Sequence, residues 1–256
     1  MLVAALAHAQ PATTDEDYIN PDRPGIADGS STVGAGRVYI EAGVQKEYRG
    51  ARGSRIETAF LPLLLRFGVR ENLEIRIEGN TYTWTKTNDP ALGVGRSDGM
   101  APTSVGVKYK FMESNGAGQP AIATIVRFFP PSGSGDFRSP RSTGDVRVAA
   151  DWNLSPQWSL NPNIGLGFYR DDSQRPYTAG LLAVTLGYNA SKSLSFFIDA
   201  GMQSPEMKHG RAAVLLDLGT AYLIGRDLQL DFSAGARAAG STPPRFFLSA
   251  GISRRY

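Results

Sequence analysis

Apolar and polar side chains alternate one by one along most of the chain after Gly36. Nine segments keep this alternation closely: 37–45, 73–78, 104–111, 146–152, 158–168, 194–199, 214–224, 228–233 and 246–253. Three more segments, 55–68, 121–129 and 177–188, carry apolar residues on both faces. A period of two is that of a β-strand with one apolar face. The sequence therefore predicts an all-β protein with about twelve strands.

The connections between these strands indicate how the sheet closes. Short turns and longer, Gly-, Pro- and charge-rich loops alternate along the chain. The short ones are 69–72, 113–119, 153–156, 189–192 and 225–227, and the longer ones are 49–54, 86–98, 130–144, 170–176, 204–210 and 241–244. This pattern is typical of a closed antiparallel transmembrane β-barrel, with short periplasmic turns and longer extracellular loops. An even strand number places both termini on the periplasmic side.

A membrane-spanning helix does not fit the sequence. The most apolar stretch, 59–69, is interrupted by Pro62, Arg66 and Gly68, and it is far shorter than the ~20 residues that a spanning helix needs. In lipid, only helices and closed barrels satisfy their own backbone hydrogen bonds. We therefore expect the chain to lie in a membrane as a barrel, with outer-membrane lipid and lipopolysaccharide as its surroundings.

The two ends of the chain carry export and assembly signals. Residues 1–9 form a short apolar run that ends in Ala7-His8-Ala9, which predicts a signal peptide without its basic region. Residues 10–35 then form a polar segment that either lies in the periplasm or plugs the lumen, and 36–256 form the barrel. The last strand ends in Tyr256, which resembles the C-terminal signal read by the barrel assembly machinery. Trp152 and Trp158 flank a short turn, as in a periplasmic aromatic girdle.

Several function classes are disfavoured by composition. The net charge of +3 comes from scattered basic residues, whereas a nucleic-acid partner needs a basic face. There is no cysteine, and His209 is the only histidine after the signal peptide, which disfavours metal sites and a Ser-His hydrolase. We expect no catalytic residues, no metal and no cofactor.

Charges of both signs occupy the polar face of the strands. They are Glu41, Glu74, Arg76, Glu78, Lys108, Lys110, Arg147, Asp151, Asp199, Asp217 and Asp231. Such residues either pair with one another and fill the interior, or line a narrow polar passage that selects solutes. The residues chosen as candidates for solute binding are Arg76, Glu78, Lys108, Arg147, Asp199, Asp217 and Asp231.

The first 110 residues resemble a known family. Asp22-Arg23-Pro24-Gly25, leading through 34–36 into 38–43, is similar to the opening of the outer-membrane proteins of the meta pathway of phenol degradation. Residues 63–76 and 105–110 resemble later strands of the same family. The resemblance implies an outer-membrane pore or transporter, and it implies no catalytic residues.

Taken together, these features predict a channel or transporter for small solutes, including aromatic or organic acids, through a narrow polar lumen. One alternative is a closed structural or adhesive barrel that acts through its long loops, whose basic residues include Arg49, Arg52, Arg55, Arg138 and Arg141. An outer-membrane hydrolase is the other alternative, and the histidine count disfavours it.

Overall fold

The structure is a computed structural model, and it describes residues 17–51, 53–116 and 118–256. The predicted signal peptide lies outside the described residues. The elements are β1 (Val38–Ala51), β2 (Ser54–Arg70), β3 (Leu73–Asp89), β4 (Gly93–Gly99), β5 (Thr103–Met112), β6 (Ala121–Phe129), the 3-10 turn η1 (Gly135–Phe137), β7 (Thr143–Asn153), β8 (Trp158–Arg170), β9 (Pro176–Asn189), β10 (Leu194–Ser204), β11 (Ala213–Ile224), β12 (Leu228–Ala239) and β13 (Phe246–Arg255).

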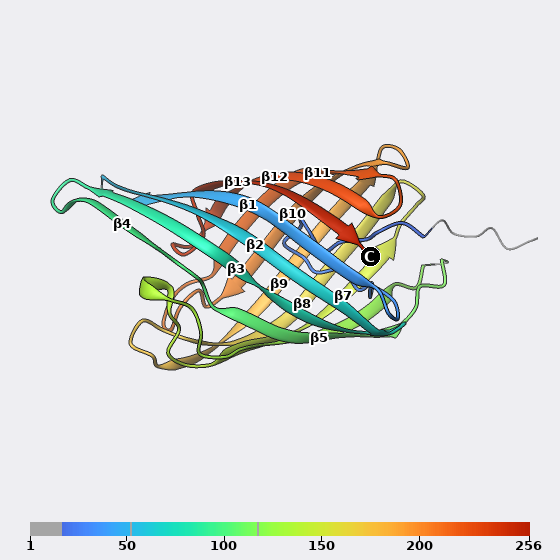
Figure 1. The fold of residues 1–256 in the computed structure, drawn as a ribbon, viewed down its shortest axis with the longest axis horizontal. Helices are drawn as coiled ribbons and strands as arrows, with labels where there is room; N and C mark the ends of the chain where they lie inside the picture. Colours follow the sequence, from blue (N-terminus) through green and yellow to red (C-terminus); the bar gives the residue numbers. More distant parts are fainter. Residues whose placement is uncertain (1–16, 52, 117) are drawn as a thin grey trace, which may run out of the picture.

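These strands close into one antiparallel barrel (Figure 1). Each strand pairs with its neighbour in sequence from β5 to β13, β13 pairs with β1, and the β2–β3 pairing completes the ring. β4 and β5 pair with successive parts of β3, because Thr83–Asp89 faces β4 and Leu73–Gly79 faces β5. β4 and β5 therefore together occupy one strand position next to β3. Counted in this way, the barrel has twelve strands, as the sequence predicted.

Two of the expected long loops are strands instead. β1 and β2 continue through most of 49–54, and β3 and β4 through most of 86–98. Threonine alternates with aromatic residues from Thr81 to Thr85, which favours an extended strand over an irregular loop. Gly53 lies in the first tight turn and Gly93 begins β4 directly after the second, with φ of +89° and +81°, a conformation that glycine adopts most readily. The barrel is consequently taller on this side, where the β3–β4 hairpin projects (Figure 1).

The outer face of the barrel is apolar and its interior is charged. Ile164, Ile198 and Leu218 are each more than 60% exposed, whereas Arg66 and Lys108 are fully buried. This reverses the arrangement of a water-soluble protein, and it is what a wall facing lipid requires. In the part of the chain that the structure describes, no helix is long and apolar enough to cross a membrane. The chain is an outer-membrane barrel.

The two ends of the barrel differ. The C-terminus and the start of the described chain lie at the same end, together with the turns after β2, β5, β7, β9 and β11 (Figure 1). Trp152 and Trp158 are exposed at this end, and Trp158 lies 4.8 Å from Tyr188, ring centroid to centroid. Short turns and an aromatic girdle are typical of the periplasmic side. We call this the periplasmic end and the opposite one the outer end.

Candidate functional site in the barrel lumen

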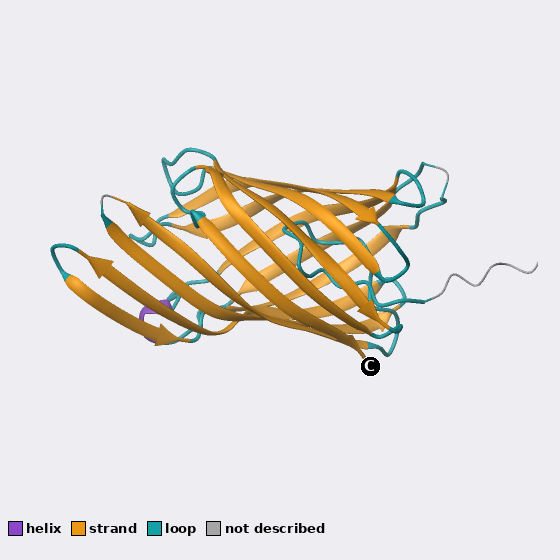
Figure 2. Cartoon of the chain, turned by 90° about the horizontal axis from the view of Figure 1, so that it is seen from above, coloured by secondary structure: helices purple, strands orange, loops and turns teal. Residues whose placement is uncertain are grey.

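Residues 17–35, which we call the inner segment, enter the barrel and leave it at the same end (Figure 2). The amide of Ile19 donates to the carbonyl oxygen of Arg226 at 2.7 Å, in the periplasmic turn between β11 and β12. Near its other end, the amide of Gly36 donates to the carbonyl oxygen of Gly68 at 2.9 Å. Between these two anchors the segment forms a loop that reaches up into the lumen.

The first group of contacts surrounds Asp22. Its carboxylate lies 2.8 Å from Lys108 Nζ and 2.5 Å from Arg76 Nη1. Arg66 is 3.8 Å away and also pairs with Glu41 at 3.1 Å and Glu74 at 2.8 Å. The side chains of Arg66, Lys108, Glu41 and Glu74 are fully buried. Buried charges are tolerated only when paired, so the segment and the wall neutralise each other.

The second group surrounds Asp28. Its carboxylate lies 3.1 Å from Arg76, 3.2 Å from Arg147 and 3.9 Å from Arg127. Asn163 fixes the backbone at the same place, since its side chain accepts from the Asp28 amide and donates to the Asp28 carbonyl oxygen, both at 2.9 Å. Asp28 thus ties the inner segment to β3, β6, β7 and β8.

The third group holds Arg23 against the opposite wall. Its guanidinium donates to Asp231 at 3.0 Å and to Ser249 at 3.1 Å, and its backbone amide donates to Glu41 at 2.9 Å. Gly43 lies beneath it, where an added methyl group would come within 2.7 Å of the guanidinium. A methyl group at Gly251 would overlap the same side chain. These two wall glycines leave the space that Arg23 fills.

Ile26 is the apolar contact at the top of the inner segment. Its amide donates to Asp199 at 2.6 Å, and its side chain lies over Gly201, where an added methyl group would come within 2.6 Å of Ile26 Cγ2. The segment therefore contacts both sides of the barrel, from Arg66 on β2 to Asp199 on β10. It spans the lumen at this level.

The seven candidate residues from the sequence differ in what they contact. Four belong to the cluster around Asp22 and Asp28, two contact Arg23 or Ile26, and the last lies beside Asp199. Arg76, Lys108 and Arg147 surround Asp22 and Asp28, and Glu78 accepts from Arg76 at 3.1 Å. Asp231 pairs with Arg23, and Asp199 binds the Ile26 amide. Asp217 is the register partner of Asp199, and one of its buried carboxylate oxygens has no hydrogen-bond partner. The structure thus separates a cationic cluster on β3–β7 from an acidic wall on β10–β12.

Sequence reasoning missed Arg66, Arg127 and the inner-segment residues as members of this site. Arg66 and Arg127 lie on β2 and β6, whose mixed faces hid which side chains point inward. A usable signal was present, because a single arginine within an apolar membrane strand is rare and marks an interior contact. Asp22, Arg23 and Asp28 lie in a segment without apolar–polar alternation, so no strand pattern could predict where their side chains point.

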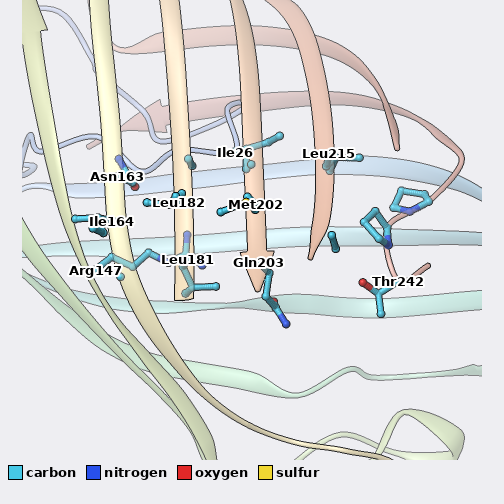
Figure 3. A pocket seen from close by; sticks show the side chains of 16 residues that line it. Ile26, Arg147, Asn163, Ile164, Leu181, Leu182, Met202, Gln203, Leu215 and Thr242 are labelled. Carbon is cyan, nitrogen blue, oxygen red and sulfur yellow. The ribbon is translucent and has the colours of Figure 1, made fainter. Parts of the chain in front are cut away.

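Above the inner segment lies a cavity of about 300 Å³ (Figure 3). Ile26 forms part of its floor, and β7–β11 form its wall. Its side nearest the outer end is the loop between β12 and β13, residues 240–245, which contributes Thr242, Pro243 and Pro244. Most of its lining is apolar, and Arg147 is its one charged lining residue among the described residues.

The loop beside this cavity is held by one carboxylate, that of Glu206 between β10 and β11. It accepts from the amides of Ser241 and Thr242 at 2.6 and 2.9 Å, and from their hydroxyl groups at 2.9 and 3.1 Å. Burial raises the pKa of Glu206, but these hydrogen bonds outweigh burial and hold the pKa below its usual value. Glu206 therefore joins two outer loops.

Solved structures share this fold. An outer membrane channel from Pseudomonas putida F1 aligns over 91% of this chain and 99% of its own, with a TM-score of 0.68 and 14% identity. The β domain of the Bordetella autotransporter BrkA covers 85% and 98%, with a TM-score of 0.54 and 13% identity. The NanC porin covers 84% and 98%, with a TM-score of 0.53 and 9% identity. At such identities the likeness is one of fold, and none of the three is an enzyme by name.

Fold and lumen together define an outer-membrane β-barrel with an N-terminal segment inside it. The family model described as "Putative MetA-pathway of phenol degradation" matches residues 21–256, so the chain belongs to this family. The resemblance inferred from the sequence is thereby confirmed. No curated protein matches the chain.

Proposed function

We propose that this protein is a channel for small solutes, including aromatic or organic acids, and that the inner segment is its gate. The observation that supports the proposal is the kind of contact that holds the inner segment against the wall. Ion pairs and hydrogen bonds hold the part of the inner segment that lies inside the lumen. Its apolar contacts are those of Ile19 and Val33 with Tyr39 and of Ile26 with Gly201. Polar contacts can be exchanged for water when a segment moves, whereas an apolar core cannot be hydrated at small cost.

In this proposal, Arg76, Glu78, Lys108, Arg147, Asp199, Asp217 and Asp231 line the route once the segment shifts. Charges of both signs on facing walls then act on a passing solute, as in other selective pores. Membership in a family named for phenol degradation supports a small aromatic solute. The outer-membrane channel fold supports a passive or facilitated route.

A closed structural or adhesive barrel is the second candidate. The density of buried ion pairs favours it, because Arg66, Arg76 and Lys108 are all almost inaccessible to solvent. Under this alternative the inner segment is a permanent filling, and the outer loops carry the function through contacts with lipopolysaccharide or another surface.

A disulfide lock separates the two candidates. If Gly201 carried a Cβ atom, it would lie 3.8 Å from the Cβ of Ile26, which is the usual separation in a disulfide. The chain has no other cysteine, so Ile26→Cys/Gly201→Cys can form only this bond. Conductance of the refolded protein would be recorded in a planar bilayer before and after reduction, with Ile26→Cys alone as the matched control.

The gate proposal expects the oxidised double variant to be silent, and expects reduction to restore the discrete openings of wild type and of the single variant. Partial block of those openings by an added aromatic acid would support the solute class. Equal conductance in the oxidised and reduced forms overturns the gate. Silence of correctly folded wild type, shown by heat-modifiable gel migration, overturns the channel and leaves the closed barrel.

A further inference from the structure

We propose that the cavity between the inner segment and the outer loops is a binding site for an uncharged, ring-sized molecule with one hydrogen-bond acceptor. The site rests on the proposed channel function, and among the small solutes of that channel it would take the uncharged ones, not the acids. Its size is suited to one ring, since a cavity of about 150 Å³ holds benzene and this one measures about 300 Å³.

The lining supplies mainly apolar contacts. Leu181 on β9 and Ala213 on β11 are buried. Ile26 lines the cavity from the inner segment (Figure 3). Pro243 and Pro244 lie on the side of the outer loop. Apolar surface arranged around a concave site, with few polar groups, is the usual environment of a small-molecule site.

The charged group at the site is already neutralised. Arg147 pairs with Asp28 at 3.2 Å and with Asp145 at 3.2 Å, and its side chain remains 20% exposed. Arg76 and Arg127 share Asp28 with Arg147, Arg127 shares Asp145, and both Arg76 and Arg127 also pair with Glu78. Three guanidinium groups thus face three carboxylates, so this group has little attraction left for an anion, yet its N–H groups can still donate. The solute that fits is therefore an uncharged one whose oxygen or nitrogen accepts a hydrogen bond, rather than a carboxylate.

The outer loop borders the site on one side because Glu206 holds it. Four donors of Ser241 and Thr242 converge on this one carboxylate, and Gln203, another lining residue, donates to the carbonyl oxygen of Glu206 at 3.2 Å. Gly240 (φ +85°) passes so close that an added methyl group would lie 2.6 Å from the carboxylate. Glu206 therefore fixes the position of the loop, whose residues Thr242, Pro243 and Pro244 line the cavity.

The test measures binding, so that it can fail separately from conductance. 4-Fluorobenzyl alcohol would be titrated into the detergent-solubilised full chain, and broadening of its fluorine NMR signal recorded with and without excess unlabelled benzyl alcohol. Ala183→Leu fills the cavity from β9, and Ala200→Leu adds the same group to the lipid-facing side of β10 as the matched control. 4-Fluorobenzoate is the charged counterpart of the probe.

We expect saturable, displaceable broadening in wild type and in Ala200→Leu, and none in Ala183→Leu. Ile26→Ala changes only the inner segment and leaves the wall intact, so it replaces Ala183→Leu as the test if that variant does not fold. In Ile26→Ala, binding of the alcohol should weaken about tenfold. Glu206→Ala should also weaken binding, because it releases the loop. Equal broadening in wild type and in both cavity variants overturns the site, and benzoate binding at least as tight as the alcohol overturns the uncharged class.

Binding without conductance would leave a closed barrel with a ligand site, which separates this proposal from the channel proposal. Gated conductance without binding would leave a channel that lacks this site.

Discussion

At the scale of single residues, the interior is organised by charges that have no access to water. Arg66 is the clearest case, because it joins Glu41 and Glu74 and also donates to the carbonyl oxygen of Ser31 at 2.7 Å. It therefore fixes two strands of the wall and the inner segment at one point. The pair Lys46–Glu57 is more open to solvent, and Glu57 also pairs with Arg55, so the loss of one such pair costs little.

We predict that Arg66→Met destabilises the barrel by about 3–5 kcal/mol, because it leaves buried carboxylates without a partner. The temperature at which heat-modifiable gel migration is lost should fall clearly. Lys46→Met is the control, and it should leave that temperature unchanged. An unchanged temperature for Arg66→Met would mean that Glu41 and Glu74 find other partners in the lumen.

At the scale of elements, Glu206 is the main anchor of the outer loop at 240–245. Arg237 adds a hydrogen bond from its guanidinium to the carbonyl oxygen of Ser241 at 3.1 Å. Glu206 is itself held, because its carbonyl oxygen accepts from the Tyr177 hydroxyl at 3.2 Å and its amide donates to the carbonyl oxygen of Arg211 at 2.7 Å. Tyr256 directly follows β13, and its amide donates to the Val38 carbonyl oxygen at 2.8 Å, in addition to the pairing of β13 with β1 and β12.

The pH dependence of the loop follows from the lowered pKa of Glu206. A carboxylate whose folded pKa is depressed contributes stability above its unfolded pKa, and this stability is lost as the pH falls through the folded value. We predict that the protection of the amides in 240–245, measured against the exchange rate of an unstructured chain at the same pH, persists on acidification to the usual glutamate pKa and is lost only below it. In Glu206→Gln, protection should be low at every pH; strong protection in this variant would show that the carboxylate does not hold the loop.

The side chain of Tyr256 is 63% exposed and its ring has no part in closing the barrel, which the backbone does. We predict that Tyr256→Ser leaves refolding into detergent unchanged but lowers the amount assembled in the outer membrane of cells. Refolding yield and membrane fractionation measure the two. Normal assembly of the variant in cells would contradict a role for Tyr256 as the signal to the assembly machinery.

At the scale of the whole molecule, the barrel and the inner segment neutralise each other. The cationic cluster of β3–β7 meets Asp22 and Asp28, and the acidic wall of β10–β12 meets Arg23. One short segment therefore completes the charge balance of a lumen built from strands that lie far apart in sequence.

Deletion of residues 17–35 should accordingly open a large, steady conductance and lower the thermal stability of the barrel. The milder double variant Asp22→Asn/Asp28→Asn keeps the segment and should raise the open probability instead, since it removes the inner-segment partners of Arg76 and Lys108 and leaves their partners on the wall. Planar-bilayer recording and gel migration measure both effects. A deletion variant with the conductance of wild type would show that the inner segment does not occlude the lumen.

The sequence by itself determined the strand pattern, the closed barrel and which wall residues share a polar face. Side-chain direction in a strand depends only on parity, so Arg76, Lys108 and Asp217 could be placed on the polar face from local pattern alone. The same rule failed for β2 and β6, where apolar residues on both faces concealed Arg66 and Arg127.

Only the tertiary structure decided where the inner segment lies and which charges it joins. Arg23 and Asp231 are separated by 208 positions in the chain, and no periodicity connects a segment without strands to a wall. Their contact depends on closure of the barrel, which pairs β13 with β1 and places β12 on the far side of β13. It also depends on the glycines at positions 43 and 251, which leave space for the arginine. Complementary charges permit many pairings, and the shape of the closed lumen selects one of them.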